Sequence, residues 1–142
     1  PAGYPLAGPL DAVDVVRLEA ADIADPAIAV MPRGKGPIGV LVWAGSPHGK
    51  AMDAEAAPWK AAAARHGIAI VLVGSSAPAA WGRTDIASVT RALAALHARR
   101  PLDTSRIGIA GTEAGAPFAW MVAERIGSGA GGVALVGSAL PR

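Results

Sequence analysis

Short apolar runs alternate with segments of helical character along most of this chain, and this alternation limits the fold more than any other feature. Two runs, at residues 38–43 (IGVLVW) and 68–73 (IAIVLV), are apolar at nearly every position. Strands of this kind need cover on both faces, which is typical of a parallel sheet between helical layers. The sequence therefore predicts an α/β fold, a three-layer sandwich with a mostly parallel sheet and right-handed crossovers.

The other elements are predicted from the same periodicities and from end signals. A helix is predicted at 53–66, because Gly67 follows it as a C-terminal stop. A second helix is predicted to start with Thr84 as its N-cap and Asp85 in its first turn, and to end near Arg99. The remaining predictions are strands at Val13–Leu18, 27–31, 106–110 and Gly132–Val136, a helix at 113–126, and an irregular lead-in over residues 1–12.

Composition limits the function classes. The 142 residues fit one domain, residues 1–142, with a net charge of +2 and no block of Lys and Arg interleaved with aromatic residues, so no nucleic-acid surface is expected. No apolar run is long enough for a membrane span. The chain has no cysteine and no His/carboxylate group with metal-ligand spacing, so neither a metal nor a cofactor is predicted. These features leave the cellular compartment open.

One short segment carries a chemical signal. Gly111 and Gly115 stand two residues on either side of Glu113, between the predicted strand and helix. A residue perched in a sharp strand-to-helix turn crowds the positions two before and two after it, and glycine relieves the clash. The perched side chain would project from the carboxyl edge of the sheet, where parallel α/β folds place their ligands.

This segment resembles the G-x-S-x-G nucleophile elbow of the α/β-hydrolase superfamily, in particular small esterases, depolymerase-like and dienelactone-hydrolase-like members. The resemblance runs from 101 to 115 (PLDTSRIGIAGTEAG) and again from 36 to 49 (GPIGVLVWAGSPHG), where the family has its oxyanion loop. It implies a partial α/β-hydrolase fold, with Glu113 at the nucleophile position and Ser46 and Ala114 at oxyanion-like positions. Trp43, His48 and Trp81 are then candidates to line a cleft, although packing of the two tryptophans explains them equally well.

The chain departs from the family in three ways. Glu113 replaces the serine, Pro47 offers no N–H in the oxyanion loop, and the sequence stops after the strand at Gly132–Val136. The resemblance implies that the triad acid and histidine follow later strands, so the C-terminal strands of the fold are expected to be missing. The chain lacks an initiator Met, and we expect it to begin inside a longer gene product.

Three functional readings follow. The first is a catalytically degenerate α/β-hydrolase-like accessory or interaction module, in which Glu113 only stabilises its helix start. Another chain or further sequence would then pair with the open edge at Gly132–Val136. The second is an active esterase or peptidase-class hydrolase whose remaining residues lie downstream or on another chain, with Glu113 as a carboxylate nucleophile. The third, a nucleotide-binding domain, is disfavoured because the glycine spacing is not G-x-G-x-x-G.

Overall fold

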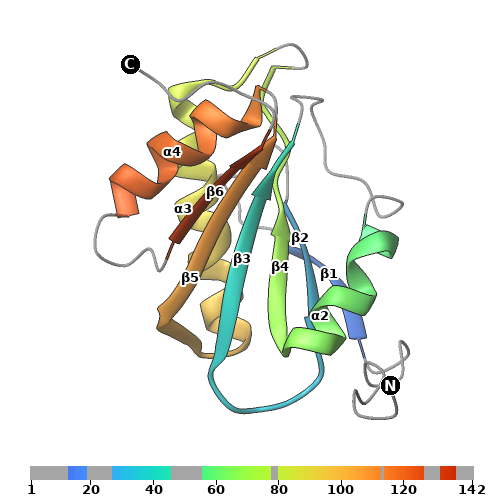
Figure 1. The fold of residues 1–142 in the computed structure, drawn as a ribbon. Coiled ribbons are helices and arrows are strands. Elements are labelled where there is room, and N and C mark those ends of the chain that lie inside the picture. Colours follow the sequence, from blue (N-terminus) through green and yellow to red (C-terminus); the bar gives the residue numbers. More distant parts are fainter. Residues whose placement is uncertain are drawn as a thin grey trace.

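A computed structural model describes residues 13–18, 27–45, 56–77, 80–112, 114–126 and 132–136, the last range by its backbone. Its centre is a six-stranded sheet in the order β1-β2-β4-β3-β5-β6 (Figure 1). The strands are β1 (Val13–Leu18), β2 (Ala27–Pro32), β3 (Ile38–Ala44), β4 (Ile68–Leu72), β5 (Leu102–Thr112) and β6 (Gly132–Val136). The pairs β3–β4, β3–β5 and β5–β6 are parallel, whereas β2 is antiparallel to both β1 and β4. The predicted mostly parallel sheet is confirmed.

Helices cover both faces of this sheet (Figure 1). On one face lie α3 (Arg83–Arg99) and α4 (Gly115–Ile126), whose Val89, Leu96 and Phe118 join the larger core. On the other face lie the 3-10 turn η2 (Ala57–Trp59) and α2 (Lys60–His66), which pack on a smaller core. Alternate residues of β1, β2, β3 and β4 enter opposite cores, as the period of two requires. The three-layer architecture is therefore confirmed.

The helix predicted at 53–66 differs from the structure. Its described part is divided into η2 and α2, and Pro58 lies inside the 3-10 turn. Proline has no N–H to donate and disfavours the α conformation of the residue before it, so the described helix is interrupted by the 3-10 turn and is regular from Lys60. The predicted stop is confirmed, because Gly67 adopts the left-handed conformation with φ of 61° and donates to the carbonyl of Ala63 at 2.9 Å.

The start of α3 also differs from the prediction. Gly82, not Thr84, is the N-cap residue, and Asp85 lies at the third helical position. An Asp85 carboxylate oxygen accepts a hydrogen bond from the Gly82 N–H at 2.8 Å. The Asp85 carboxylate, at the third helical position, reaches back to the backbone N–H of the N-cap residue. It stabilises the helix start in place of the Thr84 hydroxyl that was expected to do so.

The strand predicted at 106–110 is too short. β5 extends from Leu102 to Thr112, and the Ile38 N–H donates to the Pro101 carbonyl at 3.1 Å just before it. Residues 103–105, which lie before the predicted strand, are polar. β5 pairs with β3 from its first residue, Leu102, and residues 103–106 lie at the register irregularity between Ile38 and Val40.

Candidate functional site

The turn between β5 and α4 is the structural centre of the candidate site. β5 ends at Thr112 and α4 begins at Gly115, so two residues make the connection. Gly111 is flanked on both sides within the sheet, since it pairs with Ala44 of β3 and Leu135 of β6. The turn therefore stands at the carboxyl edge of three parallel strands, the usual place for a ligand site in this class of sheet.

Backbone crowding explains the two glycines at this turn. A Cβ on Gly111 would overlap the carbonyl oxygen of Gly115 and lie 3.0 Å from the Cα of Ala116. A Cβ on Gly115 would overlap the carbonyl oxygens of Ala44 and Gly45 and lie 2.6 Å from the carbonyl carbon of Ala44. All of these are main-chain atoms, which cannot rotate away. Helix α4 can therefore start this close to β3 and β5 only because both positions lack a side chain.

Only part of the predicted site falls on described residues. Glu113, Ser46 and His48 lie outside them. Ala114 is exposed in the turn directly before α4, and Gly45 is the last described residue of the loop after β3. The described part of the site therefore consists of main-chain groups around the turn, together with the side chains that hold the neighbouring loops.

Trp81 connects three of these elements. Its indole Nε1 donates to the carbonyl oxygen of Gly45 at 3.0 Å, which joins the loop before α3 to the end of β3. Its ring stacks on Phe118 of α4, with the ring centroids 4.3 Å apart and the planes inclined by 13°. Trp81 therefore packs against the helix that follows the turn and holds the Gly45 carbonyl beside Gly115.

Trp43 does not meet Trp81. It is packed against the smaller core on the opposite face of the sheet, where its ring lies 4.9 Å from that of Trp59. The two tryptophans that were candidates for one cleft therefore serve two different cores. Successive residues of a strand point to opposite faces, and Trp43 follows Val42, which enters the larger core.

Trp120 lies on the outer side of α4 and is 38% exposed. Its Nε1 donates to the Glu124 carboxylate one turn later, at 2.9 Å. The sheet-facing positions of α4 are instead held by Phe118, Ala119 and Val122.

Asp85 is the one buried charged side chain among the described residues, with 2% exposure. Besides the bond from Gly82, its carboxylate accepts a hydrogen bond from the Ser76 N–H at 2.8 Å. Asp85 therefore holds both ends of the loop that carries Trp81. Asp85 was predicted to lie in the helix start, but this second partner was not predictable, because Ser76 lies nine residues earlier in a loop without periodicity.

The two described histidines lie where the parallel strands begin, at the opposite end of the sheet from the turn after β5. The Nδ1 of His97 accepts a hydrogen bond from the N–H of Leu102, the first residue of β5, at 3.0 Å. His66 ends α2, two residues before β4 begins beside the start of β3. Leu102 pairs with Ile38 and Gly111 pairs with Ala44, so the two ends of β5 are six β3 residues apart, roughly 20 Å at 3.3 Å per residue. Neither imidazole is near the turn after β5.

Within the described ranges, no group of three or more His, Asp or Glu side chains could hold a metal ion. The same part of the chain contains no helix that is both long enough and apolar enough to cross a membrane.

Comparison with known proteins supports the fold. No family model matches the sequence, and no curated protein is similar to it. Among solved structures, the thermophilic carboxylesterase EstE1 from a metagenomic library matches 93% of this chain at 15% identity with a TM-score of 0.64. A bacterial heroin esterase matches 84% at 20% identity and a TM-score of 0.60, and an esterase of the bacterial hormone-sensitive lipase family matches 96% at 19% and 0.60.

This chain covers 47%, 41% and 47% of the lengths of those three structures, respectively. At such identities the likeness shows the fold alone. The described sheet order and helix placement are those of a partial α/β-hydrolase fold, as the sequence predicted.

Proposed function

We propose that this chain is a catalytically degenerate α/β-hydrolase-like accessory or interaction module of a larger protein. The observation that carries the proposal is the separation of the described imidazoles from the turn after β5, because an elbow nucleophile depends on a histidine to move its proton. The His97 imidazole accepts a hydrogen bond from Leu102 at the start of β5, and His66 lies at the end of α2, just before β4 begins. The residue on the turn is Glu113, which replaces serine in the resemblance.

The same proposal gives Glu113 a structural role. A carboxylate at the start of α4 lies near the positive end of the helix dipole, which stabilises an anion by about 0.3–1 kcal/mol. Crowding at Gly111 and Gly115 keeps the helix start in place independently of any catalytic group. A turn of this shape can therefore persist as a rigid scaffold after its chemistry is lost.

The proposed partner surface includes the edge of the sheet. β6 pairs with β5 on one side, and no described strand pairs with its other side. An unpaired parallel edge offers a row of backbone donors and acceptors, which proteins normally cover. We expect another chain or another part of a larger protein to pair with Gly132–Val136.

An active hydrolase of the esterase or peptidase class is the second candidate. It is favoured by the esterases among the similar structures and by the preserved crowding at the turn. In that reading Glu113 attacks carbon as a carboxylate, and the missing acid and histidine come from elsewhere in the assembly.

Turnover of p-nitrophenyl butyrate by the 142-residue chain tests the two candidates. The degenerate module predicts the same slow release of nitrophenol by the wild type, Glu113→Gln and the matched control Glu124→Gln, which neutralises an exposed carboxylate of α4. Activity lost in Glu113→Gln but kept in Glu124→Gln would establish the enzyme reading instead.

A mass-spectrometric screen covers the carboxylate route. If Glu113 is a nucleophile, a haloalkane forms an ester on its side chain as the carboxylate oxygen displaces the halide, and the adduct mass maps to the peptide containing Glu113. The proposed module shows no such adduct under conditions where a haloalkane dehalogenase with an aspartate nucleophile is fully labelled.

A further inference from the structure

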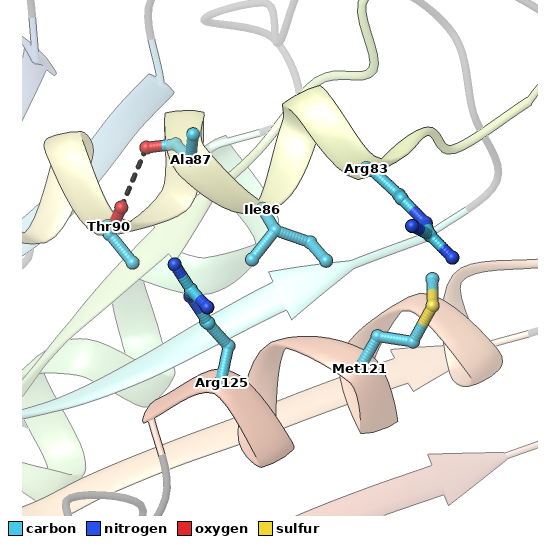
Figure 2. Close-up of a pocket in the computed structure, with 6 residues that line it drawn as sticks. All are labelled: Arg83, Ile86, Ala87, Thr90, Met121 and Arg125. Atoms are coloured by element: carbon cyan, nitrogen blue, oxygen red, sulfur yellow. Dashed lines mark hydrogen bonds between the residues drawn. The ribbon is translucent and has the colours of Figure 1, made fainter.

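A groove between α3 and α4 is independent of the turn after β5. It has a volume of about 320 Å³ and is lined by Arg83, Ile86, Ala87 and Thr90 of α3 and by Met121 and Arg125 of α4. Figure 2 shows Arg83 beside Met121 at one end, Arg125 facing Thr90 at the other, and Ile86 between them. The groove is therefore apolar in the middle and cationic at both ends.

The two arginines make no polar contact with the rest of the described fold. Both are exposed, and neither makes a hydrogen bond or ion pair with another described residue. Arg83 is also the first residue of α3, where the helix dipole favours an anion and disfavours a cation. No acidic residue is among the six that line the groove. Its charge is therefore complementary to an acidic ligand.

The middle of the groove is fixed in place by the core. Ile86 and Met121 are partly buried and pack against the larger core, so their outward surfaces form a stable apolar floor. The Thr90 hydroxyl donates to the Ala87 carbonyl at 2.8 Å, so its proton already has an acceptor within α3. An occupant thus gains by covering the floor with apolar side chains, not by hydrogen bonding to the middle of the groove.

Spacing selects the form of the occupant. Thr90 faces Arg125 across the groove and so marks the position of that arginine along α3. Arg83 and Thr90 are seven residues apart, about 10.5 Å along the helix axis. Figure 2 shows the two guanidinium groups at opposite ends of the groove with Ile86 between them, so they do not face one shared anion. On an α-helix, residues i and i+7 lie on one face at the same spacing, and residues i+3 and i+4 lie between them.

We infer that the α3–α4 groove binds an amphipathic helix of a partner protein, with acidic residues at i and i+7 facing Arg83 and Arg125 and apolar residues at i+3 and i+4 covering Ile86 and Met121. This is the helix-in-groove mode of recognition, in which apolar anchors supply the contact and the charged ends set the register. The inference does not depend on whether the turn after β5 is catalytic.

Chemical-shift mapping on the ¹⁵N-labelled 142-residue chain tests the groove. The probe is a synthetic alanine-rich helical peptide with glutamates at i and i+7 and leucines at i+3 and i+4. The expected result is shift changes concentrated at residues 83–90 and 121–125, with binding that weakens as salt is raised. Two control peptides are used. One has glutamines in place of the glutamates, and the other has its second glutamate moved to i+5, off the shared face of the helix.

Variants of the chain provide the second arm. Arg83→Gln and Arg125→Gln are each expected to weaken binding about threefold, and the double variant about tenfold, because each removes one exposed charge pair. The matched control is Arg99→Gln, which makes the same charge change on α3 outside the groove. Equal affinity of the double variant and the wild type, equal binding of the i+5 peptide, or shifts outside the groove would each overturn the inference.

Discussion

Replacing Gly115 by alanine is expected to destabilise this fold by about 3 kcal/mol, the upper end of the usual cost of overpacking. The added Cβ would overlap the carbonyl oxygens of Ala44 and Gly45, which are main-chain atoms at the end of a central strand. Relief therefore requires α4 or β3 to move, and both also contact β5. The sign of this change in stability is informative, because replacing glycine by alanine within an exposed helix stabilises a protein by up to about 1 kcal/mol.

Thermal unfolding followed by circular dichroism measures this effect. A loss of about 3 kcal/mol corresponds to a fall in Tm of roughly 12 °C for a chain of this size. Gly36→Ala is the matched control, because a Cβ on Gly36 meets nothing within 4 Å, and its Tm is expected to stay close to that of the wild type. A Tm for Gly115→Ala within 2 °C of the wild type would refute the close approach of α4 to β3.

Two other predictions concern carboxylates. Asp85→Asn is expected to cost about 2 kcal/mol in urea unfolding, because the amide cannot accept from both the Ser76 and Gly82 N–H groups and loses the charge that strengthens those bonds. The pKa of Asp103 is lowered, first by the Ser105 hydroxyl and then by the Ser105 backbone N–H, so Ser105→Ala should raise it toward its ordinary value of 3.8 in an NMR titration. Because the folded-state pKa of Asp103 is lowered, ionised Asp103 stabilises the fold above pH 3.8. This stabilisation is lost as the pH falls through the folded-state pKa. The Ser105→Ala variant should therefore lose less stability over that pH range.

The strands were the most predictable part of the fold. The apolar runs at 38–43 and 68–73 have so few polar positions that only a doubly covered strand suits them, and both became central strands. The glycine after α2 was equally predictable, because its left-handed conformation is a local backbone requirement. These features depend on residues close together in the sequence.

Features that depend on distant residues were not predictable. Trp81 was a candidate for the same cleft as Trp43, with packing as the alternative, and its position is set by Phe118 and by the carbonyl of Gly45, 36 residues away. The second partner of Asp85 and the extension of β5 at its start likewise come from the pairing of separate segments. Local patterns carry no information on which loop a side chain will meet.

The sequence by itself determined the α/β class, the mostly parallel sheet and the glycine spacing around Glu113, because apolar periodicity and the lack of a Cβ act within a few residues. The tertiary structure alone decided which face each tryptophan serves, how far the described histidines lie from the turn after β5, and that two arginines border one groove. Those relations arise when crossover connections bring separate elements together, and each depends on the order of strands in the sheet rather than on any single segment.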